Sequence, residues 1–232
     1  MARVTQREQL DDPNLPDAVA RLAYREIARI HRWLGNEWSM IRAIRRNPVP
    51  VRRILDVGCG AGFVLSRIAR AVGAEAIGVD IRAGLDRETH VTIVRADACY
   101  ERLPEADVAL CMCLCHHMEP DELIAMIRNV GCYCRRFIIL DLVRSRLPLG
   151  LFRLFVTPFV SRITADDGII SIKRSYRAHE LRELAERALA GTQATFRCHV
   201  APFQVRQMVD IDYGHGFAET LAAQCDLNAE LA

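Results

Sequence analysis

The stretch Ile54-Leu55-Asp56-Val57-Gly58-Cys59-Gly60-Ala61-Gly62-Phe63 decides the fold of this chain. Its first residues are apolar and predict a short strand that ends in an acidic residue, Asp56. Three alternating glycines follow, and apolar residues then recur at helical spacing from Phe63 to Val72. Glycine adopts positive φ and lets a ligand approach without meeting a Cβ atom. A strand, a glycine loop and a helix in this order predict a binding site for a nucleotide-like ligand at the carboxyl edge of a parallel sheet.

Further acidic and histidine residues follow the next predicted strands. Asp80 ends a strand at 76–80, at the distance from the glycine loop where an acid binds a pair of ribose hydroxyls. A strand at 91–94 leads into Asp97, and a strand at 106–111 leads into the pair His116-His117. A fifth strand, 137–141, follows a helix that begins near Pro120. Strands that alternate with helices indicate a parallel sheet, so these side chains are expected along one edge.

As a set, the glycine loop, Asp80, Asp97 and the double histidine resemble the class I S-adenosylmethionine-dependent methyltransferases. The resemblance covers roughly residues 50–143. It implies an α/β fold with a Rossmann-like, seven-stranded, mostly parallel sheet, an antiparallel C-terminal strand, helices on both faces and an N-terminal helical cap. It also implies that S-adenosyl-L-methionine is the cofactor and S-adenosyl-L-homocysteine the product.

The resemblance also assigns roles to residues at the cofactor. The glycine loop would lie under the methionine part, Asp80 would bind both ribose hydroxyls and Asp97 would meet the adenine amino group. Asp56 would lie by the ammonium group, and a carboxylate-rich cleft suits a ligand that carries a sulfonium and an ammonium. The complete set expected at the cofactor is Asp56, Gly58, Cys59, Gly60, Gly62, Asp80, Ile81, Asp97, Ala98 and Met112.

The double histidine is expected where the methyl group is transferred. A neutral imidazole either takes the proton of the acceptor or orients the acceptor; the structural alternative is a pair that caps the following helix. We expect His117 to be the catalytic residue. Asp141 and Arg144 either face the substrate or form a local ion pair. The side chains expected near the substrate are Trp33, Trp38, His116, Asp141, Arg144, Phe152 and Phe155.

The composition limits the classes of partner and compartment. The 232 residues are 51% hydrophobic and 26% charged, which is typical of one globular domain, and the net charge of +2 gives no reason to expect a nucleic-acid partner. Nine cysteines, an odd number, and a start without an apolar signal segment predict reduced thiols and a cytoplasmic protein. We expect no metal site, because Cys111, Cys113 and Cys115 alternate along a strand and are explained better by packing.

The chain divides into three predicted parts. Residues 1–50 form an N-terminal arm and a helical cap, with helices at 17–34 and 38–44; residues 51–210 form the core; and residues 211–232 form a C-terminal tail. The core carries an apolar lid insertion at 144–172, in which 164–168 is expected to be a loop and 169–172 either a short strand or a stretch that rests on the lid. Beyond it we expect a helix at 178–190 and an antiparallel pair of strands at 195–200 and 203–209.

The apolar residues at 147–160 need a covering partner. The stretch is interrupted by Pro148, Arg153 and Pro158 and is too short to span a bilayer. Three explanations stay open: a lid over an apolar substrate, a contact in a homodimer rather than a monomer, and a transient contact with a membrane surface. We favour the lid.

The function expected from these features is methyl transfer to a hydrophobic small molecule, specifically O-methylation of a phenolic or polyketide-derived compound in secondary metabolism. C- or N-methylation of a quinone or lipid-like acceptor is one alternative, and a protein or RNA methyltransferase is another. A dinucleotide-dependent oxidoreductase is disfavoured, because Phe63 stands where the dinucleotide fingerprint has its third glycine.

Overall fold

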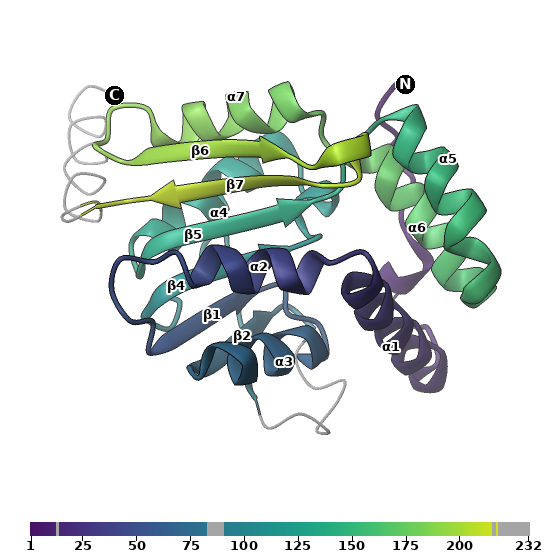
Figure 1. The fold of residues 1–232 in the computed structure, drawn as a ribbon, viewed down its shortest axis with the longest axis horizontal. Coiled ribbons are helices and arrows are strands. Elements are labelled where there is room, and N and C mark those ends of the chain that lie inside the picture. Colours follow the sequence, from purple (N-terminus) through teal and green to yellow (C-terminus); the bar gives the residue numbers. More distant parts are fainter. Residues whose placement is uncertain (13, 83–90, 215–216, 218–232) are drawn as a thin grey trace.

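The computed structural model of the chain describes residues 1–12, 14–82, 91–214 and 217. A seven-stranded sheet with the order β3-β2-β1-β4-β5-β7-β6 forms its centre (Figure 1). The first five strands are parallel, and β7 is antiparallel to both β5 and β6. The strands are β1 (Arg53–Val57), β2 (Glu75–Asp80), β3 (Thr92–Arg95), β4 (Ala106–Met112), β5 (Cys134–Asp141), β6 (Thr195–Val200) and β7 (Gln207–Asp212). The expected sheet is confirmed.

Helices cover both faces of this sheet, as the alternation of strands and helices predicts. On one face, α2 (Asn36–Ile44) and α3 (Phe63–Val72) bury Met40 and Leu65 against Leu110 of β4. On the other face, α4 (Pro120–Gly131) and α7 (Ala178–Leu189) bury Ile127 and Leu184 in a second apolar cluster. The central strands are buried on both sides and are therefore almost continuously apolar.

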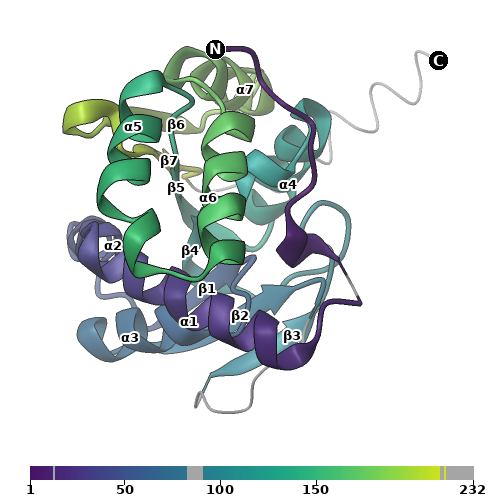
Figure 2. The same ribbon diagram turned by 90° about the vertical axis from the view of Figure 1, so that its right-hand side faces the viewer.

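The N-terminal residues follow a different course from the simple arm that the sequence predicts. They run along the molecule as an extended segment with a short 3₁₀ turn, Gln9–Asp11, before α1 (Asp17–Trp33) begins (Figure 2). The segment is tied to distant parts of the chain: the Arg3 guanidinium donates to the carbonyls of Met118 and Arg174. The two expected cap helices are present as α1 and α2.

The insertion after β5 is entirely helical. It consists of α5 (Arg146–Phe155), a 3₁₀ turn (Thr157–Phe159) and α6 (Arg162–Arg174). The expected loop at 164–168 is therefore wrong, and of the two alternatives for 169–172 the strand is wrong, because these residues are helical. Ser161 is the N-cap, and its hydroxyl accepts from the Thr164 amide. Gly168, which suggests a turn, lies inside α6 because the Phe152 ring of α5 occupies the space of a side chain.

The C-terminal strands were expected in this antiparallel arrangement. The strand at 195–200 is confirmed as β6, but the second strand begins at Gln207 and not at 203, because Pro202–Gln204 forms a 3₁₀ turn in which Phe203 has φ of 58°. Of the expected tail at 211–232, residues 215, 216 and 218–232 lie outside the described part.

Within the described part, no helix is long and apolar enough to cross a membrane.

The carboxyl ends of the parallel strands meet α1, α5 and α6 at one end of the sheet (Figure 1). This is the end at which open parallel sheets bind their ligands.

Candidate active site

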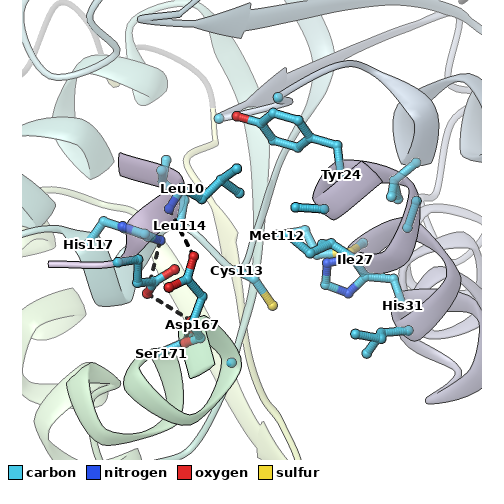
Figure 3. A pocket seen from close by; sticks show the side chains of 18 of the residues that line it. Leu10, Tyr24, Ile27, His31, Met112, Cys113, Leu114, His117, Asp167 and Ser171 are labelled. Atoms are coloured by element: carbon cyan, nitrogen blue, oxygen red, sulfur yellow. Dashed lines mark hydrogen bonds and ion pairs between the residues drawn. The ribbon is translucent and has the colours of Figure 1, made fainter. Parts of the chain in front are cut away.

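A cavity of about 310 Å³ opens between the strand ends and the helices α1, α5 and α6. Its lining comes from four parts of the chain: the N-terminal segment, α1, the loops after β1, β2 and β4, and the α5–α6 insertion. Figure 3 shows two facing walls, with Tyr24, Ile27 and His31 of α1 on one side and His117 and Asp167 on the other.

The glycine loop after β1 forms the floor of the cofactor end of this cavity. Gly58 and Gly60 have φ of 72° and 53°, a conformation that other residues rarely adopt. A Cβ atom on Gly58 would lie 2.7 Å from Leu114, and one on Gly60 would lie 2.9 Å from Tyr24. The loop therefore needs glycine at both positions, for backbone conformation and for space.

Two acidic side chains face this end of the cavity. The carboxylate of Asp80 accepts the backbone N–H of Gly60 and that of Arg82, both at 2.8 Å, which fixes its position at the end of β2. Asp56 is buried and lines the cavity, and its carboxyl has no hydrogen-bond partner among the described residues. Burial and the nearby charge of Asp80 raise the pKa of Asp56 to about 8.

These features fit the cofactor that the sequence predicts. A buried acid without a partner is costly unless a ligand supplies a hydrogen-bond donor or a positive charge, and an ammonium group supplies both. Asp80 keeps lone pairs free for hydroxyl groups, since a carboxylate has about four acceptor positions. Asp56, the glycine loop and Asp80 would hold S-adenosylmethionine in the order that the resemblance implies.

The other end of the cavity contains a cluster of histidines and carboxylates. Backbone turns at Cys113, which has φ of 55°, and at Cys115–His117 carry the chain from β4 into the cavity. The His116 ring is buried, and its Nδ1 lies 2.8 Å from an Asp141 oxygen. Both Nε2 atoms approach one oxygen of Glu8, at 3.5 Å from His116 and 3.6 Å from His117.

The electrostatics of this cluster follow from its close packing. Burial disfavours the charged form of His116, but Asp141 and Glu8 favour it and raise its pKa to about 10. Burial likewise opposes ionisation of Asp11, yet His117 lowers the pKa of Asp11 to about 2. His116 is therefore a positively charged group between the carboxylates of Asp141 and Glu8.

Apolar and neutral groups complete the walls. His31 is fully buried, and burial lowers its pKa to about 4, so its imidazole is neutral and pairs with Asn36 at 2.9 Å. Apolar side chains from α1, its C-cap and the insertion line the cavity: Ala23, Ile27, Ala28, Ile30, Leu34, Phe152 and Ile172. The insertion also contributes the polar residues Thr164, Asp167 and Ser171. A cavity with few polar groups in an apolar wall suits a hydrophobic organic ligand.

The structure brings most of the expected residues together. Ten of them line the cavity, with Asp141 directly behind as the partner of His116. The ten lining residues are Asp56, Gly58, Cys59, Gly60, Asp80, Ile81, Met112, His116, His117 and Phe152. Gly62 is the N-cap of α3, one residue beyond the lining.

Other expected residues lie elsewhere. Trp33 and Trp38 are 57% and 59% exposed and stack with Arg29 and Arg42 instead of lining the cavity. Phe155 is exposed on the outer side of α5.

Asp97, Ala98 and Arg144 are also absent from the described lining. The Asp97 carboxylate accepts the backbone N–H of Cys99, and Ala98 is buried. Arg144 is buried in an ion pair with Glu180.

Several polar residues of the cavity were not expected from the sequence, among them Glu8, Asp11, Asp167 and Ser171. Asp167 accepts the backbone N–H groups of Gln9 and Leu10, which joins α6 to the N-terminal segment. The acidic residues of the N-terminal segment form no motif that predicts a site, because they enter the cavity through contacts with residues more than 150 positions away.

Comparisons with known proteins agree with this arrangement. Residues 54–136 match the family model described as a methyltransferase domain. Indolepyruvate C-methyltransferase from Streptomyces griseus is 25% identical over 186 residues, which are 74% of this chain and 52% of that protein. The chain thus spans about half the length of this curated relative.

Solved structures show the same fold. The plantazolicin methyltransferase BpumL, in complex with a monoazolic desmethylPZN analog and S-adenosylhomocysteine, superimposes with a TM-score of 0.66 at 16% identity, over 88% of this chain and 91% of that one. Magnesium protoporphyrin IX methyltransferase from Synechocystis PCC 6803, with bound S-adenosylhomocysteine, gives 0.51 at 16% identity, over 89% and 92%. By its matched domain, its curated relative and its fold, the chain is similar to the class I S-adenosylmethionine-dependent methyltransferases.

Proposed function

We propose that this chain transfers the methyl group of S-adenosylmethionine to an oxygen of a hydrophobic small molecule, such as a phenolic or polyketide-derived compound. The observation that carries the proposal is one continuous cavity that joins the Asp56–Gly60–Asp80 rim to the histidine–carboxylate cluster. A cofactor at the rim and an acceptor at the cluster share this space.

S-adenosylmethionine, when bound, supplies a methyl group activated by a sulfonium. The chain's own residues then have three tasks: to bind, to align and to exclude water. Asp56 and Asp80 bind the cofactor end. The apolar wall from α1 and the insertion excludes water from the acceptor end, and this role of Phe152 supports the lid explanation for the insertion.

An oxygen acceptor suits the polar groups at the acceptor end. His117 is held by carboxylates on both ring nitrogens, with Nδ1 3.4 Å from Asp11 and Nε2 3.6 Å from Glu8. Its side chain is about one quarter exposed, so a hydroxyl group in the cavity can reach it. His117 therefore remains our predicted catalytic residue, either as the group that takes the acceptor proton or as the group that orients the hydroxyl.

Methylation of carbon is the second candidate, because the curated relative is named a C-methyltransferase. The acceptor would then be a carbon acid whose enol oxygen faces the same histidines. BpumL was solved with a desmethyl natural-product analog, and the Synechocystis enzyme is named for a porphyrin, so organic acceptors are represented among the neighbours.

The test uses S-adenosylmethionine labelled with ¹³C in the methyl group and a panel of phenolic and polyketide-derived acceptors. The chemical shift of the transferred methyl distinguishes oxygen, nitrogen and carbon products. We expect an O-methyl product, with turnover that falls by about 10²- to 10⁴-fold in His117→Gln if the imidazole takes the proton.

The matched control is His199→Gln, which removes an exposed histidine from β6 and should leave turnover unchanged. A C-methyl product would favour the second candidate. Full turnover of His117→Gln would remove His117 from the catalytic step.

A further inference from the structure

Glu8, His116 and His117 present three potential metal ligands to one point in the cavity. One Glu8 oxygen and the two Nε2 atoms lie within 4.8 Å of one another. The oxygen is 3.5 Å from the first imidazole and 3.6 Å from the second. A tetrahedral ion with bonds of about 2.0–2.1 Å places its ligand atoms roughly 3.3 Å apart, so little movement is needed to close a site here.

The Nδ1 atoms of both histidines have carboxylate partners, as ligand histidines in metal sites commonly do. Nδ1 of His116 lies 2.8 Å from Asp141, and Nδ1 of His117 lies 3.4 Å from Asp11. A histidine that binds a metal through one nitrogen almost always gives its other N–H to a carboxylate, a carbonyl or water. Here both histidines have a carboxylate at Nδ1, which leaves both Nε2 atoms directed toward Glu8.

The carboxylate ligand is itself oriented. The Ser171 hydroxyl donates to the Glu8 oxygen at 2.8 Å, from α6. Glu8 is buried, and its carboxylate is contacted by side chains from two other parts of the chain, the loop after β4 and α6. A preorganised metal site requires ligands that are held in position by neighbouring side chains in this way.

The composition and surroundings of the site indicate the class of ion. Two imidazoles and one carboxylate form a donor set typical of Zn²⁺ hydrolases and of Fe²⁺ enzymes, and not of Mg²⁺ or Ca²⁺, which prefer oxygen. All three residues line the cavity, so a coordination position is open toward it. Three protein ligands with one open position are typical of catalytic metal sites, not structural ones.

We propose that Glu8, His116 and His117 bind one divalent first-row transition ion, with an open position directed into the cavity. The sequence alone predicts no metal site, because Glu8 is separated from the histidines by more than 100 residues.

The role of the ion rests on the proposed function. An acceptor oxygen in the open position would be oriented toward the cofactor end, and coordination would make its O–H more acidic, so that the proton is lost to solvent. His117 would then act as a ligand, and no imidazole would be needed as the base.

The competing explanation is a network of charges without a metal. Arg174 lies 4.0 Å from the same Glu8 oxygen and 3.3 Å from Asp11, and protonated imidazoles would balance the remaining carboxylates. The two explanations differ in stoichiometric metal binding, which can be measured directly.

The experiment uses the full chain without a histidine tag. The metal content of the purified protein is determined by mass spectrometry; the ion is then removed with a chelator, and Zn²⁺ and Co²⁺ are titrated back. We expect one ion per chain and, for Co²⁺, a visible spectrum of nitrogen and oxygen ligands. Glu8→Gln and His117→Gln should lose stoichiometric binding, and Asp141→Asn should weaken it by about 10- to 100-fold.

Two controls separate this proposal from the proposed function. His199→Gln should bind the ion as the original chain does, and all variants should still bind S-adenosylhomocysteine, which reports on the fold and on the other end of the cavity. Absence of stoichiometric binding in the original chain would overturn the proposal. Binding that survives Glu8→Gln, or a Co²⁺ spectrum with a thiolate charge-transfer band, would also overturn it by placing the ion on the cysteines.

Discussion

Asp56 illustrates how one residue couples ligand binding to stability. Its pKa rises from an ordinary value of 3.8 to about 8 in the folded chain, because the carboxyl is buried and near Asp80. Between these two values the folded chain holds a proton that the unfolded chain releases. Stability without cofactor therefore falls as the pH rises through this window.

Replacement of Asp56 with Asn removes this dependence. We expect Asp56→Asn to match the original chain near pH 4 and to exceed its free energy of unfolding by about 5 kcal/mol at pH 8. The measurement is urea unfolding across this pH range without ligand, with Asp166→Asn, at a half-exposed carboxylate, as the control. Parallel stability curves for the two chains would show that Asp56 is ionised at neutral pH.

At the scale of elements, the contact between α5 and α6 shapes the acceptor end of the cavity. A Cβ atom on Gly168 of α6 would lie 2.3 Å from the tip of the Phe152 ring of α5, whereas one on Gly150 of α5 would have nothing within 4 Å. Both glycines lie inside helices, so the same substitution tests packing at one position and helix propensity at the other.

We expect opposite effects from the two alanine substitutions. Gly168→Ala should displace Phe152, lower the free energy of unfolding by about 1–3 kcal/mol and raise the KM for the acceptor. Gly150→Ala should raise the free energy of unfolding by about 0.5–1 kcal/mol and leave KM unchanged. Denaturant unfolding and steady-state kinetics measure both. Equal effects at the two positions would contradict the described packing.

Sequence patterns predicted the elements whose structure is determined by residues close together in the sequence. The parallel strands are continuous apolar runs, and the glycine loop requires its glycines, so the sheet and the cofactor end followed from the sequence. The predictions were wrong where contacts with residues distant in the sequence determine the structure. The loop expected at 164–168 is helical because Ser161 caps it and Phe152 packs on Gly168. Trp33 and Trp38 were expected at the substrate because they lie in the predicted N-terminal cap, but the orientation of their helices exposes them.

At the scale of the whole molecule, the N-terminal segment closes the acceptor end. It carries Glu8 and Asp11 to the histidines and is held by Asp167 of α6. These contacts join residues 158 to 163 positions apart on the α6 side. No local pattern could have predicted them.

Deletion of residues 1–12 should therefore separate binding from turnover. We expect S-adenosylhomocysteine to bind within about tenfold of its original affinity, since Asp56, the glycine loop and Asp80 remain. We expect kcat/KM for the acceptor to fall by at least about 100-fold, because both histidines lose Glu8, His117 also loses Asp11, and the cavity opens to water. Titration calorimetry and methyl-transfer kinetics measure the two quantities. Undiminished turnover would mean that the segment has no part in the site.

The central claim, a cofactor at the Asp56–Gly60–Asp80 rim, is tested most directly by parallel calorimetric titrations with S-adenosylmethionine, S-adenosylhomocysteine and NAD. The account predicts saturable binding of the two sulfur compounds at one site per chain and no binding of NAD. It also predicts a loss of about 100-fold or more in affinity in Asp80→Ala, because the proposed role of this carboxylate is to accept two ribose hydroxyls. Binding of NAD alone, or affinity for S-adenosylhomocysteine that is unchanged in Asp80→Ala, would contradict it.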